Sequence, residues 1–219
     1  MFRAIPAALA GAVASVTLCA CVIAPDAPVT TPDGLVKVNN AKVDSVYATP
    51  GMSLARYRRV LLENVDVAFK HDWQQRHPEI PPEDVAMIRH GAASVFREEF
   101  ARELEKGGYE MSGRIAPDVL RVSASVVDLD FVAQNAAAGA GKPAYMVTPA
   151  DMSLLAELRD AQSGAMLARV ADRNRGRSAG NLRVADQMAL TDEARAAFAN
   201  WAGLLRAALD AARQAPPAK

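Results

Sequence analysis

The C-terminal part of the chain carries the strongest amphipathic pattern in the sequence. Apolar residues recur there at the spacing of one helical face, and small, polar or charged residues occupy the other positions. Such a helix is stable in a protein only when its apolar face packs against other elements. The pattern therefore predicts a helix, capped by Thr191, that packs onto the rest of one domain. The apolar stripe consists of Ala194, Ala197, Phe198, Trp201, Leu204, Leu205, Ala208, Leu209 and Ala212.

A second helix is predicted to follow Pro81 and Pro82 and to stop at Lys106-Gly107-Gly108. Pro81 and Pro82 precede two acidic residues in the first turn, and Lys106 stands in the last turn, as the helix dipole favours. Gly107 and Gly108 follow, and a glycine there can take the left-handed conformation that ends a helix. The apolar face consists of Val85, Ile88, Ala92, Val95, Phe96, Phe100 and Leu104.

Three stretches alternate between apolar and polar residues, which is typical of strands. Residues 58–69 predict one strand. Residues 119–131 predict another, with a β-bulge near Val126, because the apolar positions change parity there. Residues 152–170 predict a hairpin whose turn lies at residues 160–164.

The order of strand, helix, several strands and helix predicts an α+β fold. We expect a two-layer domain in which both helices pack on one face of a mainly antiparallel sheet. Residues 21–52 contain several prolines and glycines and no sustained apolar period, which is typical of a flexible tether. The predicted organisation is a signal peptide at residues 1–20, a lipidated N-terminus and tether at 21–52, one domain at 53–213 and a disordered tail at 214–219.

The first residues have the layout of an exported lipoprotein signal. An uncharged apolar run begins after Arg3 and closes with Leu18-Cys19-Ala20-Cys21. In this motif the small residue Ala20 precedes the cleavage site, and the thiol of Cys21 accepts a diacylglyceryl group. Two other interpretations are an uncleaved membrane helix, which Pro6 argues against, and a Cys19–Cys21 disulfide, which would need a strained loop. We predict that Cys21 is lipid-modified.

A lipid anchor would place the protein in a bacterial envelope. Two or three acyl chains give firm membrane attachment. By analogy with enteric bacteria, Val22 instead of aspartate after the lipidated cysteine favours the outer membrane. The 25 basic and 25 acidic residues balance, so the chain lacks the positive charge that a nucleic-acid partner requires. We expect a periplasm-facing domain that binds an envelope protein or a cell-wall component.

Two groups of residues are candidates for metal or acid–base chemistry. Asp128 and Asp130 lie two apart on a predicted strand, so both carboxylates could share one face, as a cation site or an acid–base pair requires. The alternative is an exposed polar face. The second group combines imidazole and carboxylate side chains, which are good zinc ligands. Its spacing matches no familiar zinc motif, and a solvated loop is the alternative. That second group is His71, Asp72, Trp73, His77 and His90.

Patterns for other enzyme chemistry are incomplete. Ser123 and Ser125 have no nucleophile-elbow context. The glycine-rich residues 137–142 lack the glycine spacing and the hydroxyl of a phosphate-binding loop. We therefore predict no enzyme activity, no cofactor and no metal site.

Arginines gather after the predicted hairpin. Arg169, Arg173, Arg175 and Arg177 occupy alternate positions, where guanidinium groups could bind a phosphate or carboxylate, or an acidic partner. The alternative is a set of ordinary surface pairs with Asp160 and Asp172. We treat these arginines as a candidate anion or partner surface.

Several short sequence motifs occur in the same order as in a known protein family. They include Leu158-Arg159-Asp160, Ser163-Gly164 and residues 167–173, followed by the Trp201 region. Residues 57–67 and 118–122 add earlier blocks. Together these motifs resemble the bacterial lipoprotein family known as domain of unknown function 3313, over most of residues 50–213. The resemblance implies an exported lipoprotein and supplies no catalytic residues.

The leading hypothesis is a non-catalytic envelope lipoprotein that serves as a binding or accessory subunit. The lipoprotein signal and a predicted domain without a catalytic motif support this hypothesis. Two alternatives stay open: an envelope hydrolase or metal-dependent enzyme, and an oligomeric secretion or transport component.

Overall fold

The computed structural model describes residues 29–215, apart from residues 40–41, 135–143, 149, 176–187 and 191. Cys21, the signal, the glycine-rich loop, Arg177 and the cap Thr191 lie outside the described residues. The elements are β1 (Val36–Val38), β2 (Ser45–Ala48), β3 (Arg59–Leu62), β4 (Asp66–Phe69), α1 (Trp73–Arg76), α2 (Pro82–Lys106), β5 (Glu110–Met111), β6 (Val119–Gln134), β7 (Ala144–Thr148), β8 (Ala150–Asp160), β9 (Met166–Arg175), β10 (Met188–Leu190) and α3 (Asp192–Gln214).

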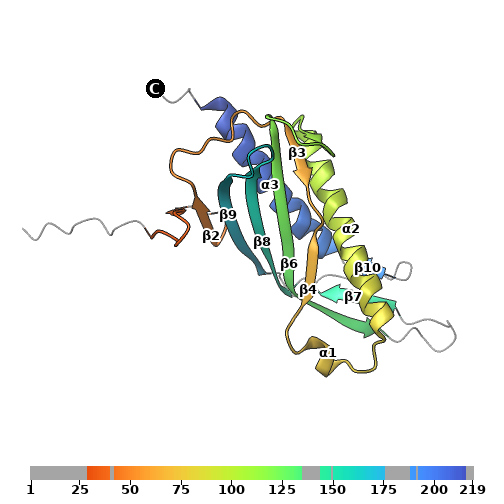
Figure 1. Cartoon of the computed structure of the whole chain (residues 1–219). Helices are drawn as coiled ribbons and strands as arrows, with labels where there is room; N and C mark the ends of the chain where they lie inside the picture. Colours follow the sequence, from red (N-terminus) through yellow and green to blue (C-terminus); the bar gives the residue numbers. More distant parts are fainter. Residues whose placement is uncertain are drawn as a thin grey trace, which may run out of the picture.

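The strands form one sheet around the long strand β6 (Figure 1). Its order is β1-β2-β9-β8-β6-β3-β5, and β4 and β7 also pair with β6. The predicted hairpin is present as β8 and β9, and the β1–β2, β2–β9 and β6–β8 pairs are also antiparallel. The strands β3 and β4 run parallel to β6, and β5 runs parallel to β3.

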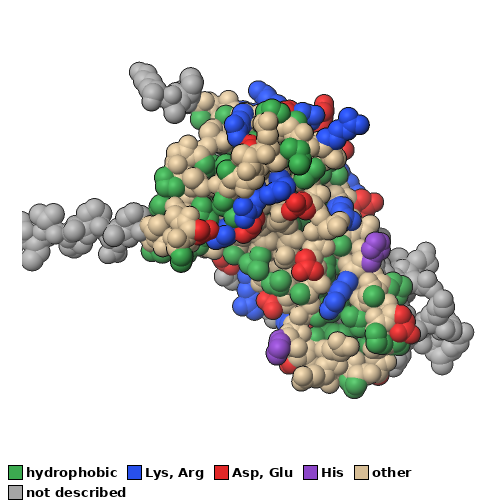
Figure 2. All heavy atoms as spheres, in the orientation of Figure 1, with side chains coloured by type: hydrophobic (Ala, Val, Ile, Leu, Met, Phe, Trp, Pro, Cys, Tyr) green, Lys and Arg blue, Asp and Glu red, His purple; other side chains and the backbone are tan. Residues whose placement is uncertain are grey.

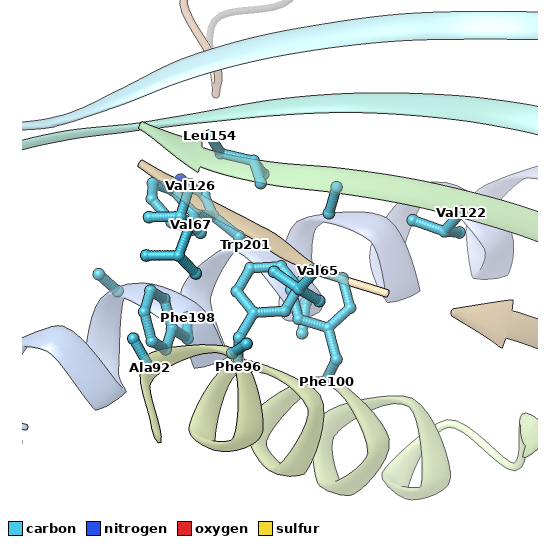
Figure 3. Close-up of a cluster of buried hydrophobic side chains, with 14 of the residues drawn as sticks. Val65, Val67, Ala92, Phe96, Phe100, Val122, Val126, Leu154, Phe198 and Trp201 are labelled. Carbon is cyan, nitrogen blue, oxygen red and sulfur yellow. The ribbon is translucent and has the colours of Figure 1, made fainter. Parts of the chain in front are cut away.

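Both long helices pack on one face of the sheet, which confirms the predicted α+β fold. Side chains from α2 and α3 meet side chains from β4, β6 and β8 in one core (Figure 3). The ring centroids of Phe96 and Phe100 lie 4.2 Å apart, and those of Phe96 and Phe198 lie 5.2 Å apart. Because close-packed rings exclude water, this contact stabilises the two layers together.

The strand predicted at residues 58–69 is divided into β3 and β4, so the prediction of one strand is wrong. Val60 in β3 and Val67 in β4 are both buried, although they lie seven positions apart, an odd offset. Uninterrupted alternation would place these two side chains on opposite faces. The break at residues 63–65 corrects the parity and lets Val65 also face the core.

The predicted bulge in β6 lies two residues beyond Val126. Asp128 has a φ of 60°, in the left-handed region, and the pairing of β4 with β6 shifts register there. The bulge restores burial at Leu129 after the buried series that ends at Val126. It also marks the point where β6 leaves its partner β8 and begins to pair with β7.

The domain begins earlier than the sequence predicted. Residues 36–38 and 45–48 form strands β1 and β2, so the assignment of residues 21–52 to a flexible tether is wrong for this part. Leu35 is buried, and β2 pairs with β9 in the main sheet. Sequence periodicity missed these strands because three or four residues are too few to show a period.

Helix α2 ends with the predicted glycine cap. Gly108 has a φ of 73°. The amide of Tyr109 donates to the carbonyl of Leu104 at 3.1 Å, and the amide of Gly108 donates to that of Glu105 at 2.9 Å. These two hydrogen bonds define a Schellman motif.

Replacing Gly108 with alanine is expected to lower the free energy of unfolding by about 1 kcal/mol, because a Cβ penalises the left-handed conformation. No neighbouring atom lies within 4 Å of the added Cβ, so the conformation alone carries the effect. Urea denaturation of the mature chain would measure it. The control is Gly113→Ala, which has open space and no positive φ, and an equal loss there would contradict this explanation.

Candidate functional site

The face of the sheet opposite the helices carries two rows of side chains across its strands. Strand register places Tyr47, Arg169, Glu157 and Ser123 side by side in the first row. The second row consists of Ser45, Ala171, Leu155, Ser125 and Asp66. We call these nine residues the helix-free face. They line a shallow groove of about 540 Å³, together with Asn64 and the intervening strand residues.

Opposite charges are paired across the first row. Glu157 accepts hydrogen bonds from Arg169 Nε and Arg159 Nη2, each at 2.9 Å. Arg169 Nη1 also lies 2.8 Å from an Asp33 carboxylate oxygen. The hydrogen bond from Arg169, aided by Arg159, lowers the pKa of Glu157 below its usual value. The carboxylate is therefore held in its charged form at neutral pH.

The groove continues to a second carboxylate beyond Ser123. The Ser123 hydroxyl donates a hydrogen bond to Glu63, and Arg121 Nε lies 3.7 Å from the other oxygen of that carboxylate. Alternating acidic and basic groups therefore cross the sheet. In Figure 2, basic and acidic side chains lie next to one another in the middle of the visible face.

Leu155 is the apolar centre of the helix-free face. Its side chain is 47% exposed, although it lies on the central strand β8 of the sheet. Its cross-strand neighbours are Ala171 and Ser125, which are too small to cover it. Leu155 therefore gives the groove an apolar centre that charged and hydroxyl-bearing side chains surround.

The structure describes the side chains of two of the four arginines of the candidate anion or partner surface. Arg169 lies in the groove between two carboxylates, and Arg173 is exposed further along β9. The side chain of Arg175 is outside the description, as is Arg177. Asp160 and Asp172, the expected surface partners of these arginines, bind other residues. Asp160 binds Arg56, and Asp172 binds the Trp201 indole. An anion would have to compete with Glu157 and Asp33 for Arg169.

The bulge separates the two aspartates that were candidates for metal or acid–base chemistry. Asp128 is exposed and occupies the left-handed residue of the bulge. Asp130 lies 3.2 Å from the ammonium group of Lys70. The regular alternation on which the candidate pair depended is interrupted at Asp128, and Asp130 pairs with Lys70.

The histidine-rich loop is built around a buried tryptophan. Trp73 in α1 is fully buried and stacks on His77, with 4.8 Å between ring centroids. His77 Nδ1 lies 3.2 Å from Glu79, and Asp72 pairs with Arg76 at 3.1 Å. His90 is exposed on α2. Over the residues that the structure describes, no three His, Cys, Asp or Glu side chains gather as metal ligands.

Sequence reasoning did not find most of the helix-free face. Of its members, the sequence identified Arg169 as part of a candidate anion or partner surface. It indicated Ser123 and Ser125 only as hydroxyls without a nucleophile-elbow context. Tyr47 lies in a short strand that periodicity did not reveal. The available signal was the alternation of Leu155, Glu157 and Arg159 with the buried residues of β8, which identifies an outward row but not its neighbours.

The fold and this face define a two-layer α+β domain with two helices on one side of its sheet and an open, charge-paired groove on the other. The chain belongs to the DUF3313 family of proteins of unknown function, whose model matches residues 28–205. A search of curated proteins finds no match. In the described part of the chain, no helix combines the length and apolarity needed to cross a bilayer.

Similar solved structures share low sequence identity with the chain. The PelC dodecamer from Paraburkholderia phytofirmans is 19% identical, with a TM-score of 0.38, and the match covers 72% of this chain and 96% of that one. A variant of PelC gives a TM-score of 0.39 at 19% identity, covering 74% and 95%. A hemagglutinin homolog from Helicobacter pylori is 15% identical, with a TM-score of 0.25 and coverage of 73% and 86%.

Proposed function

We propose that the protein is a bacterial envelope lipoprotein, anchored in the outer membrane through a lipid on Cys21. It binds a protein partner with the helix-free face and catalyses no reaction. The observation that carries the binding proposal is the exposed Leu155 at the centre of the charge-paired groove. The signal-like residues 1–20 and the cysteine that follows them carry the anchoring proposal.

The composition of the face favours a protein over a phosphate-rich ligand. Protein interfaces combine an apolar centre with polar and charged groups around it. Leu155 supplies such a centre, and Tyr47 is a residue type enriched in interfaces. A phosphate site would instead need arginines whose charge is available, and Arg169 is already neutralised by Glu157 and Asp33.

A photoreactive amino acid at Leu155 is expected to give one adduct of defined mass in living cells. Incorporation at Ser45 or Ser125 should trap the same partner, because these positions lie on the same face. The matched control is Met87, which is 42% exposed on α2, on the other side of the domain. Mass spectrometry of the purified adducts would identify the partner.

Equal labelling from Leu155 and Met87, or no adduct from the helix-free face, would contradict a specific binding surface. Adducts that contain only a second copy of this chain would replace the accessory-subunit proposal with self-assembly. A partner captured from all three face positions and not from Met87 would support the proposal.

Replacing Cys21 with alanine is expected to abolish lipid attachment and release the protein from outer-membrane fractions. The physical reason is that the acyl chains supply the membrane affinity, at about 0.8 kcal/mol for each buried CH₂ group. Intact-mass measurement of the mature N-terminus and membrane fractionation would test this. Cys19→Ala is the matched control, because its side chain would leave with the signal. A wild-type protein that begins elsewhere or lacks lipid would contradict the anchoring proposal.

A further inference from the structure

The described chain begins at one edge of the sheet. Val29 and Thr30 run beside β1: the amide of Lys37 donates to the carbonyl of Val29 at 2.9 Å, and Thr30 forms an antiparallel bridge with Val36. Strand β1 pairs with β2, which pairs with β9 in the main sheet. The chain therefore enters the domain at the edge formed by β1 and residues 29–30, beside β2 in Figure 1. We call this the entry edge.

The distance from the proposed lipid to the entry edge is limited by chain length. Eight residue steps separate Cys21 from Val29. A polypeptide of this length spans at most about 29 Å in any conformation. The sheet itself is as wide: its order runs from β1 to β5 through six strand intervals, or up to about 29 Å at normal strand spacing. The entry edge therefore stays within about one sheet width of the lipid-bearing residue.

The entry edge also exposes apolar side chains. Val29 is 59% exposed and Val38 is 43% exposed. Lys37, which pairs with Val29 and directly precedes Val38, is exposed as well. Exposed valines and a lysine suit the boundary between lipid headgroups and acyl chains, where apolar groups are buried and cations meet anionic lipids. The opposite edge also exposes apolar side chains, Met111 and Ile115, so the attachment of the lipid-bearing segment at the entry edge is what orients the sheet.

We propose that the entry edge faces the membrane surface, so that the sheet stands with β1 near the lipid and β5 away from it. This inference rests on the proposed lipid at Cys21. In this orientation the helix-free face is roughly perpendicular to the bilayer and is not covered by it. Its groove therefore stays open to a partner beside the domain. The occupant of the entry edge is a phospholipid surface.

Energy transfer from the protein to labelled lipids can test the orientation. After Cys21 is acylated, a cysteine introduced by Val38→Cys or Met111→Cys is the free thiol for a donor dye. Val38 and Met111 are comparably exposed, at 43% and 36%, and lie at opposite edges of the same sheet. The purified lipidated full-length mature protein would be reconstituted into phosphatidylethanolamine–phosphatidylglycerol vesicles that carry an acceptor on the lipid headgroups.

We expect transfer from Val38 to exceed transfer from Met111 by about twofold or more, because the two edges lie up to about 29 Å apart. A long glycine–serine linker inserted after Pro28 should reduce this difference. Equal transfer from vesicle-bound protein, or greater transfer from Met111, would overturn the proposed orientation. An unchanged difference with the long linker would overturn the limiting role of the short connection.

The anchoring proposal fails in a distinguishable way. If Cys21 carries no lipid, the protein does not float with the vesicles and its intact mass lacks acyl groups. In that case neither dye position transfers energy. The orientation is tested only through protein that floats and has the lipidated mass, so equal transfer there counts against the orientation alone.

Discussion

Replacing Trp201 with alanine is expected to lower the free energy of unfolding by about 4 kcal/mol, the largest effect that we predict for a single residue. The indole is 3% exposed in the core between α3 and the sheet, and its ring centroid lies 6.0 Å from that of Phe198. Alanine would leave a large cavity because the surrounding helix and strands can collapse only partly. Urea denaturation followed by circular dichroism would measure the loss.

The indole also joins three segments through one carboxylate. Trp201 Nε1 donates to Asp172 Oδ2 at 2.8 Å, and Asp172 Oδ1 accepts the amide of Asp44 at 3.0 Å. Trp201→Phe keeps most of the ring and removes the donor, so we expect a smaller loss of about 1–2 kcal/mol. Met87→Ala, at an exposed position of α2, is the control and should change stability little. Equal effects of the alanine and phenylalanine variants would contradict the cavity explanation.

Replacing Asp160 with asparagine is expected to lower the free energy of unfolding by about 2–3 kcal/mol at neutral pH. This carboxylate is buried at the hairpin turn. One oxygen accepts hydrogen bonds from the amide and hydroxyl of Ser163, both at 2.7 Å. The other accepts from Tyr57 Oη at 3.0 Å and from Arg56 Nη2 at 2.5 Å. An amide cannot accept all four, and the buried Tyr57 hydroxyl would lose a charged partner.

The effect of Asp160 should depend on pH in a defined direction. Hydrogen bonds from the Ser163 amide and hydroxyl, followed by those from Tyr57 and the charge of Arg56, lower the pKa of Asp160 from 3.8 to about 2. A pKa that is lower in the folded than in the unfolded protein stabilises the fold above the unfolded value. The contribution is therefore complete above about pH 4 and is lost as the pH falls from 3.8 toward 2.

Denaturation of wild type and Asp160→Asn across this range would test the direction. The stability difference between the two proteins should shrink as the pH falls, because the wild-type carboxylate becomes protonated. Asp118→Asn is the control: its side chain is 37% exposed and paired with Arg59, so its loss should cost less than about 1 kcal/mol. A difference that grows on acidification would contradict the assigned pKa shift.

The sequence predicted the parts of the fold that repeat over many residues. The helices α2 and α3 were visible because their apolar stripes extend over about five turns each. The glycine cap was visible because a basic last turn and two glycines coincide there. The β8–β9 hairpin was visible because alternation stops at turn residues and then resumes.

Short elements and the positions of parity changes were harder to predict. Strands β1 and β2 are too short to show a period, and they are stabilised by pairing with β9, which is distant in sequence. The break between β3 and β4 restores the parity of Val65 relative to Val60, but its place follows from pairing with β6. The same holds for the exact bulge residue, Asp128, since the change of partner from β8 to β7 fixes it.

By itself the sequence determined the helices, the hairpin and the signal-like residues before Cys21, because each depends on neighbours within one segment. The order of the helices and strands along the chain then indicated the two-layer class. Only the tertiary structure decided which outward side chains meet. Tyr47, Arg169, Glu157 and Ser123 come from four strands and lie in one row through cross-strand register. Register depends on long-range hydrogen bonds and shared burial, which no local pattern contains.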